Sequence, residues 1–214
     1  WLPDKIERTL FAMEKAEEQA GKETPVLVHT DLTVVDEDLR VLASSYRHTV
    51  NGNWQRTALH WELAQNTVTG CTAMYNRALG DLLQDEPSFF VMHDWWLALT
   101  ASAFGLIVPL DEATILYRQH GDNAVGAKFV RSPRYLLRRL FDVKGYRKEL
   151  AETFLQSESF YDAFRDRLSP EQRALTAGYG SLSQAGWLRR RWFQLKNRTV
   201  KYGVVKKAAG FLFG

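Results

Sequence analysis

The 214-residue sequence contains a single cysteine, Cys71, and only 6 prolines and 14 glycines. One cysteine cannot form an internal disulfide, and no stretch reaches the roughly 18 consecutive apolar residues that a membrane-spanning helix needs. With 45% hydrophobic and 25% charged residues, the composition is typical of a globular protein. We therefore expect a cytoplasmic chain that does not cross a membrane, with one domain or one domain plus a helical appendage.

Several motifs of common enzyme classes are also absent. The sequence has no Gly-x-x-x-x-Gly-Lys phosphate loop, no Gly-x-Gly-x-x-Gly fingerprint, no Gly-x-Ser-x-Gly elbow and no His-Glu-x-x-His zinc motif. The corresponding classes of nucleotide-binding proteins, hydrolases and metalloproteases are set aside.

Acidic residues are absent after Glu171. Eight of the 28 basic residues lie in 181–214, so residues 1–180 carry 20 basic and 25 acidic side chains and are net acidic. Because most of the chain is net acidic, we expect no nucleic acid partner. On a helix, one side of the tail would be apolar beneath a basic surface, able to bind an anionic membrane or to pack on preceding helices. That side consists of Leu188, Trp192, Leu195, Tyr202 and Val205.

Hydrophobic periodicity predicts strands that alternate with helices over the first 125 residues, which indicates an α/β fold. Helices are expected at 4–20, at 56–65, in a short segment near residue 80, and from His93 to Phe104, where a left-handed Gly105 would end the helix. In the first helix, the apolar positions are Ile6, Leu10 and Met13. Strands are expected at 25–31, 67–75, 106–110 and 113–117.

The residues after Asn123 are predicted to be helical. Ser132-Pro133 and Ser169-Pro170 each place a capping hydroxyl before a proline, and Gln172 completes a capping box in the second pair. We divide the chain into an α/β part (1–126), a helical extension (127–180) and a basic amphipathic tail (181–214). Apolar residues continue at helical spacing in this region: Leu136, Leu137, Leu140, Phe141, Leu150 and Phe154.

Three positions are candidates for chemistry. Asp94 lies at a predicted helix start, where it is either an N-cap or a general base. His120 lies in a polar loop after a strand, where it is either a surface residue or a ligand. Gly70, beside Thr72, marks a bulge or a close approach of a ligand to the backbone. Cys71 has no base adjacent in sequence and is expected to be a small buried hydrophobe.

Five segments together resemble the family 2 glycosyltransferases, and within them the bacterial rhamnosyltransferase-like branch. The resemblance covers residues 1 to about 126, and the order of the segments makes it more specific than any single motif. The opening resembles the stretch that follows the Asp-x-Asp metal motif of that branch. We therefore expect the second, acceptor-side half of a GT-A domain, with its first half missing. The segments are Trp1-Leu2-Pro3-Asp4-Lys5-Ile6, His29-Thr30-Asp31-Leu32 with Val35-Asp36, Asn66-Thr67-Val68-Thr69-Gly70-Cys71-Thr72, His93-Asp94-Trp95-Trp96 and Tyr117-Arg118-Gln119-His120-Gly121-Asp122-Asn123.

The resemblance implies a role for each candidate. Asp94 would be the catalytic base, and His120 would help to hold Mn²⁺ or Mg²⁺. Substrate contacts would come from the loop of Gly70, Cys71 and Thr72. They would also come from His93, Trp95 and Trp96. In the wider family, the position of His93 is often occupied by Glu. Together with Trp54, these tryptophans could stack on sugar faces, although core packing is the commoner use of tryptophan.

The implied reaction is an inverting transfer of a sugar, rhamnose or a related one, in bacterial surface-glycan synthesis. The donor would be a nucleoside-diphosphate sugar such as dTDP-rhamnose, and the acceptor a glycan or a lipid-linked glycan at the inner face of the cell membrane. This chain alone would be inactive. The alternative is a non-catalytic membrane-surface or assembly module derived from such an enzyme.

Overall fold

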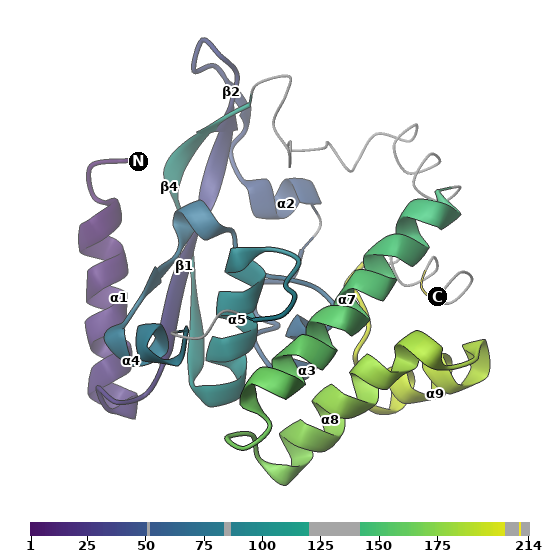
Figure 1. Cartoon of the computed structure of the whole chain (residues 1–214). Coiled ribbons are helices and arrows are strands. Elements are labelled where there is room, and N and C mark those ends of the chain that lie inside the picture. The colour runs from purple at the N-terminus through teal and green to yellow at the C-terminus, as the bar shows by residue number, and fades with distance from the viewer. Residues whose placement is uncertain (51, 84–86, 120–141, 204–209, 211–214) are drawn as a thin grey trace.

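A small mixed sheet lies between helices in the computed structural model, which describes residues 1–50, 52–83, 87–119, 142–203 and 210 (Figure 1). The central strand is β1 (Val26–Val35). Two short strands, β2 (Val41–Ala43) and β3 (Met74–Tyr75), pair antiparallel with opposite ends of β1. The long strand β4 (Leu106–Arg118) runs parallel to β1 over its whole length. The predicted α/β class is therefore confirmed at the level of a mixed sheet with helices.

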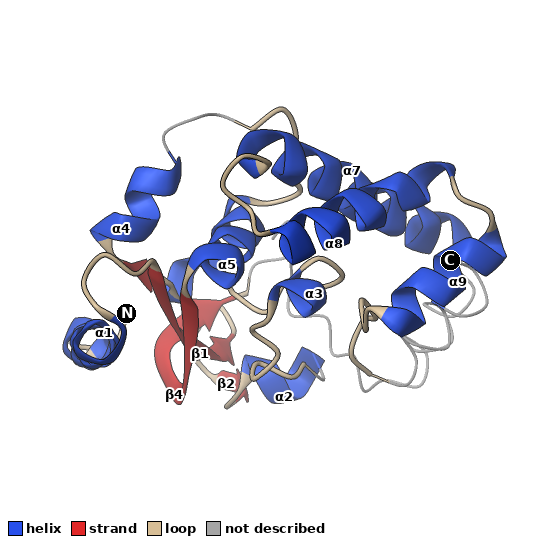
Figure 2. Ribbon diagram, turned by 90° about the horizontal axis from the view of Figure 1, so that it is seen from below, coloured by secondary structure: helices blue, strands red, loops and turns tan. Residues whose placement is uncertain are grey.

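Strand β1 is buried because helices cover both faces of the sheet. Figure 2 shows α1 (Lys5–Ala20) on one side and α5 (His93–Phe104) on the other, with α7 (Val143–Phe164) and α8 (Pro170–Gly180) beyond α5. A β-branched, apolar sequence suits a strand enclosed in this way. Accordingly, Val26, Val28 and Val34 are fully buried.

Three sequence predictions about this layer were wrong in detail. Residues 106–117 form one strand rather than two, because irregularities in the pairing with β1 near Asp31 absorb the polar turn that the sequence suggested. The expected strand at 67–75 is instead a 3-10 turn, η1 (Gly70–Thr72), followed by the two residues of β3. The helix expected at 56–65 is limited to α3 (Leu59–Glu62). Short elements complete the layer: α2 (Tyr46–Val50), α4 (Arg77–Gly80) and η2 (Asp81–Leu83).

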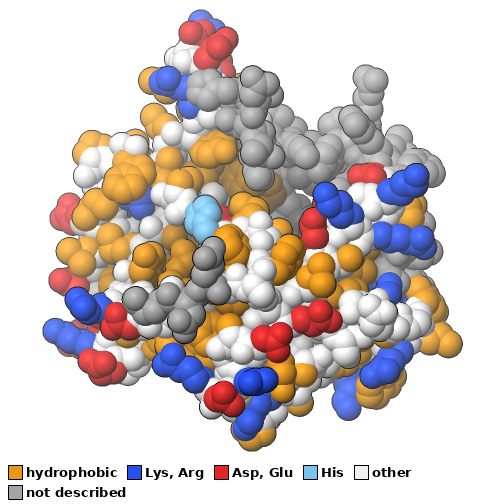
Figure 3. Space-filling view, viewed as in Figure 1, with side chains coloured by type: hydrophobic (Ala, Val, Ile, Leu, Met, Phe, Trp, Pro, Cys, Tyr) orange, Lys and Arg blue, Asp and Glu red, His pale blue; other side chains and the backbone are white. Residues whose placement is uncertain are grey.

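The helix α1 was predicted correctly, but its buried face was not. Lys5, Thr9, Met13 and Ala16 face the sheet, whereas Ile6, Leu10 and Phe11 are exposed. Figure 3 shows hydrophobic side chains gathered over this side of the molecule. The periodicity located the helix correctly, but apolarity did not identify the face that packs on the sheet.

Gly105 ends α5 for a different reason from the predicted one. Its φ of −164° is extended rather than left-handed. A Cβ added there would lie 1.8 Å from the carbonyl oxygen of Pro25, so only glycine fits where the chain turns from α5 into β4.

The second part of the structure consists of α7 (Val143–Phe164), α8 (Pro170–Gly180), η3 (Ser181–Gln184) and α9 (Trp187–Lys196). The predicted capping box is confirmed: Ser169 accepts from Gln172 N, and its own N–H donates to Gln172. Ser132-Pro133 and residues 136–141 lie outside the described residues. No described helix is both long enough and apolar enough to cross a membrane. The buried aromatic residues of this part join Trp96 of α5 in one hydrophobic cluster; they are Tyr146, Phe154, Phe160, Phe164 and Tyr179.

Candidate active site

Asp94 occupies the first turn of α5, but it does not cap the helix. The N-cap residue is Met92, so the N-cap alternative is wrong. The buried carboxylate instead accepts hydrogen bonds from outside the helix. Its Oδ2 accepts from Gly70 N at 2.9 Å, and its Oδ1 accepts from Asn66 Nδ2 at 3.1 Å. Each oxygen keeps a further lone pair, so this fixed carboxylate can still accept a proton.

Gly70 allows the backbone to approach α5 closely. A Cβ at this position would lie 2.7 Å from His93 Nε2 and 3.3 Å from the Cβ of Asp94. The sequence predicted a bulge or an approach to a ligand; the structure has a 3-10 turn that approaches two side chains. The glycine therefore lets the η1 backbone hold the carboxylate of Asp94 while His93 stays exposed beside it.

The other two residues of η1 differ in their surroundings. Thr72 is fully buried and donates from Oγ1 to the carbonyl oxygen of Thr69. Cys71 is exposed rather than buried as expected. Partial burial of the sulfur still raises the pKa of the Cys71 thiol. The thiolate form, which a cysteine nucleophile needs, is therefore disfavoured.

A lysine that the sequence analysis did not select lies beside the same turn. The Lys5 ammonium is buried, donates to the carbonyl oxygen of Thr72 at 3.2 Å and lies 4.9 Å from the ring centre of Trp1. Burial lowers the pKa of Lys5. Lysine is seldom buried unless it is paired, and no carboxylate of the described residues pairs with it. Its ammonium is instead held inside the protein by the carbonyl of Thr72 and the ring of Trp1, and so links α1 to η1.

The sequence analysis also missed a buried carboxyl group behind Asp94. Glu62 ends α3, and both the N–H and the hydroxyl of Thr67 donate to it. Burial is the main cause that raises the pKa of Glu62 to about 8, and the nearby charge of Asp94 adds to the effect. Thr67 directly follows Asn66, so Glu62 fixes the segment whose amide holds Asp94. No sequence motif indicates a role for Glu62, and its importance becomes visible only from its contacts in the tertiary structure.

The predicted tryptophans have three different environments. Trp96 is a core residue whose ring centre lies 5.3 Å from that of Phe160, so it is not placed to stack on a sugar. Trp95 is half-buried and donates from Nε1 to the carbonyl oxygen of Glu62. Trp54 is half-buried, with the Arg47 guanidinium 5.3 Å from its ring centre.

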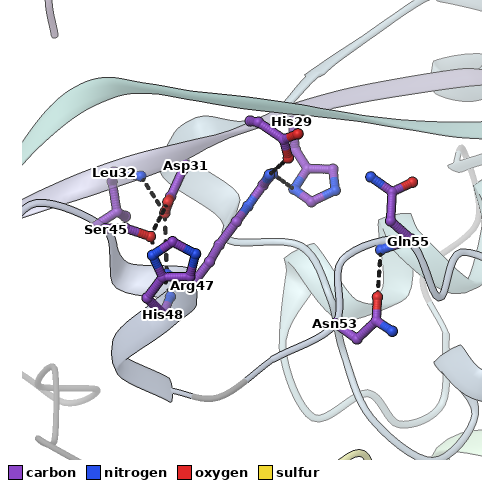
Figure 4. Close-up of polar contacts among 9 residues, drawn as sticks. His29, Asp31, Leu32, Ser45, Arg47, His48, Asn53 and Gln55 are labelled. Atoms are coloured by element: carbon purple, nitrogen blue, oxygen red, sulfur yellow. Dashed lines mark hydrogen bonds and ion pairs between the residues drawn. The ribbon is translucent and has the colours of Figure 1, made fainter.

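A second polar cluster lies along β1, in the segment His29–Leu32, which is one of the five segments of the sequence resemblance (Figure 4). Asp31 accepts from the hydroxyl of Ser45 and from the N–H groups of Leu32 and Arg47, which ties α2 to the sheet. Arg47 donates to His29 Nδ1, and burial with this cation nearby lowers the pKa of His29 to about 3. His29 is thus a neutral core side chain, and the cluster positions α2.

A shallow pocket borders the segment that holds Asp94. The Arg56 guanidinium lies 5.0 Å from the ring centres of both Trp61 and Tyr202. Tyr202 N donates to Gln65 Oε1 at 2.8 Å, one residue before Asn66. The segment after α9 therefore contacts the loop that supports the candidate base. The pocket is lined by Asn53, Arg56, Trp61, Gln65, Thr67, Val200 and Tyr202.

A metal site was predicted through His120, which lies outside the described residues. Among the residues that the structure describes, no three His, Cys, Asp or Glu side chains are grouped to hold a metal ion. The part of the chain that the structure describes therefore contains no group of side chains that could serve as a metal centre.

Comparison with known proteins adds no assignment. No protein-family model, curated protein or solved structure matches the chain.

Proposed function

We propose that this chain is the acceptor-side part of an inverting glycosyltransferase of the family 2, rhamnosyltransferase-like type. The observation that carries the proposal is the held carboxylate of Asp94, at the start of α5 and against the Gly70 backbone. Two of the five segments that resemble this family come together here: one contains Asp94, and the other contains both of its hydrogen-bond donors, Asn66 and Gly70.

In the proposed reaction, Asp94 accepts the proton of an acceptor hydroxyl. The oxygen attacks the anomeric carbon on the face opposite the nucleoside diphosphate, and the new C–O bond forms as the bond to the diphosphate breaks. The diphosphate leaves with the electron pair, and the configuration of the sugar is inverted. Hydrogen bonds from Asn66 and Gly70 keep the carboxylate in one orientation for this proton transfer.

The donor in this proposal is a nucleoside-diphosphate sugar such as dTDP-rhamnose, and the η1 turn lies beside its sugar. Lys5 holds this turn in place, because its buried ammonium donates to the carbonyl of Thr72. Mn²⁺ or Mg²⁺ belongs to the proposal through the resemblance and His120, and would neutralise charge on the leaving diphosphate. The described residues do not form a site for it, so the steps above use only side chains of this chain.

The proposed acceptor is a glycan, free or lipid-linked, in bacterial surface-polysaccharide synthesis. We place the enzyme in the cytoplasm, peripherally on the inner face of the cell membrane. Transfer also needs the nucleotide-binding half of a GT-A domain, so we expect residues 1–214 alone to be inactive. The competing proposal, a non-catalytic membrane-surface or assembly module, is favoured by the apolar side chains exposed on α1 and α9.

The decisive test is Asp94→Asn in a protein that includes the nucleotide-binding half. Loss of the base should lower the transfer rate by about 10²–10⁴-fold. Asparagine places an amide donor against Asn66 or Gly70, which should reduce the free energy of unfolding by about 1–3 kcal/mol. Initial rates and denaturant unfolding measure the two effects separately.

Two further variants complete this test. Gly70→Ala should also lower the rate, because its Cβ displaces His93 and Asp94. Asp166→Asn is the matched control, since this carboxylate is 92% exposed and should leave transfer unchanged. Activity of Asp94→Asn within threefold of wild type would reject Asp94 as the base. Absence of transfer from wild type that includes the nucleotide-binding half would instead favour the non-catalytic module.

A further inference from the structure

Helix α9 turns its apolar side chains outward. Its buried residues are polar, Arg191 and Gln194. In contrast, Leu188, Trp192 and Leu195 are 75%, 62% and 65% exposed. An amphipathic helix on a protein surface normally buries its apolar stripe, so α9 has the opposite arrangement.

Specific contacts fix this orientation of α9. The ring of Phe193 packs on α8, where a Cβ at Gly178 would lie 2.5 Å from it. Arg190 donates to the carbonyl oxygens of Leu182 and Ser183, at 2.9 and 3.1 Å, and Arg191 donates to the carbonyl of Gly210. Because these residues face the protein, the opposite side of the helix faces solvent.

The exposed side combines an apolar row with a basic border. Leu188, Trp192 and Leu195 are spaced by four and three residues, which places them on one side of the helix. Arg189 and Lys196 are exposed next to this row, and Lys196 Nζ lies 4.8 Å from the ring centre of Trp192. No acidic residue follows Glu171 in the sequence, so α9 itself carries only positive charge.

We infer that this side of α9 binds an anionic phospholipid surface, with the three apolar side chains entering the interface and the basic border meeting the headgroups. Helices that lie in a membrane interface typically have leucine and tryptophan on one side, with lysine and arginine beside them. Each basic residue near anionic lipid adds attraction, and tryptophan favours the headgroup level.

The position of α9 leaves this side accessible. Figure 2 shows α9 at the end of the molecule opposite α1. A membrane bound there would leave the side of the sheet that α1 covers free. The inference rests on the proposed location at the membrane but not on the proposed chemistry, because binding requires neither a donor sugar nor Asp94.

The test is cosedimentation of the full chain with vesicles of phosphatidylcholine, with or without phosphatidylglycerol, at low and high salt. Wild type should bind the vesicles that contain phosphatidylglycerol, and more weakly at high salt. Leu188→Ser and Trp192→Ser should each lower the partition coefficient by about tenfold. Both side chains are exposed, so circular dichroism should confirm unchanged folding.

Two control variants isolate the surface. Phe11→Ser removes a side chain that is 68% exposed on α1, and should leave vesicle binding unchanged. Lys196→Gln should lower binding to anionic vesicles by about fivefold, whereas Arg77→Gln, on a side chain that is 93% exposed on α4, should not. The inference is overturned if wild type fails to bind, if Phe11→Ser and Trp192→Ser have equal effects, or if α9 mediates self-association instead. Loss of transfer in Asp94→Asn with intact vesicle binding would separate the two proposals.

Discussion

The α/β part and the helical part of this protein are stabilised by different kinds of core. The α/β part buries charged side chains, among them Lys5, Arg47, Glu62 and Asp94. Helices α7 and α8 bury aromatic and aliphatic side chains, and their buried polar residues are uncharged, such as Thr153 and Gln156. Among the described residues of the helical part, the buried charged side chain is Arg191 of α9, which donates to the carbonyl of Gly210. A buried charge is costly unless it is hydrogen-bonded or paired.

This difference indicates where chemistry can occur. Ionisable groups with altered pKa values concentrate at functional sites, although structural networks shift pKa values as well. Around Asp94, the altered pKa values of Glu62 and Lys5 accompany a fixed carboxylate and a glycine-dependent approach of the backbone. The cluster of Asp31 and Arg47 is the structural counterpart, since its hydrogen bonds tie α2 to β1.

The largest effect on stability is expected at the aromatic contact between the two parts. Phe160 is fully buried, and its ring centre lies 5.3 Å from that of Trp96 and 4.9 Å from that of Phe164. Phe160→Ala should lower the free energy of unfolding by about 3–5 kcal/mol, measured by denaturant titration. Leu155→Ala, on a half-exposed side chain of the same helix, is the control and should cost much less. Similar losses for the two variants would mean that this cluster does not join the parts.

The sequence predicted the elements better than their contacts. Helix α5 and the Ser169 capping box were located correctly because the signals for helix ends are local. The single strand at 106–118 and the turn at Gly70 were missed, since both depend on pairing with distant residues. In α1, the structure buries Lys5 and Thr9, whereas the apolar pattern indicated Ile6 and Leu10. The hydrophobic periodicity of a helix does not determine which surface of the protein it packs against.

The candidate site was predicted in part. Asp94 and Gly70 were selected from the sequence, and the structure brings them into contact. The support from Asn66 and Glu62 was missed, because a residue's role in holding another one depends on the tertiary fold. His120 lies outside the described residues, so its role stays a prediction.

The next prediction tests the buried charge of the α/β part through pH. The pKa of Glu62 is raised to about 8 in the folded protein, from an ordinary value of 4.5. Between these values the unfolded chain loses a proton that the folded protein keeps, so the contribution of Glu62 to stability should fall as pH rises from about 4.5 to 8. The slope from Glu62 is at most about 1.4 kcal/mol per pH unit. His29, whose pKa is lowered to about 3 by burial and by Arg47, contributes the opposite slope below its ordinary value of 6.5, so the effect of Glu62 is read from the difference between wild type and a Glu62 variant.

Glu62→Gln should remove this slope, because glutamine stays neutral and its oxygen can still accept from Thr67. Denaturant unfolding at several pH values measures the difference between the variant and wild type. Glu14→Gln, on the exposed side of α1, is the control and should keep the wild-type dependence on pH. Parallel stability curves for wild type and Glu62→Gln would contradict the altered pKa and weaken the contrast between the two cores.

The smallest effect is expected at the start of α8, where the helical part depends on a local, solvent-exposed interaction. Ser169 Oγ accepts from Gln172 N at 3.2 Å and donates to Glu171 Oε2 at 2.9 Å, while Ser169 N donates to Gln172 Oε1 at 2.9 Å. Ser169→Ala removes the hydroxyl and keeps the backbone half of the box, so the free energy of unfolding should fall by about 1 kcal/mol.

Ser181→Ala is the control: its exposed hydroxyl only donates to the carbonyl of Gly178, and its loss should change little. A backbone hydrogen bond and the Ser169 hydroxyl lower the pKa of Glu171 from its ordinary value of 4.5, so this carboxylate is ionised at both pH 5 and pH 8. The loss should therefore be similar at the two pH values in denaturant unfolding, unlike that of Glu62→Gln. A pH-dependent loss at Ser169 would mean that the helical part also depends on buried or coupled charge, and that the two cores differ less than their residues indicate.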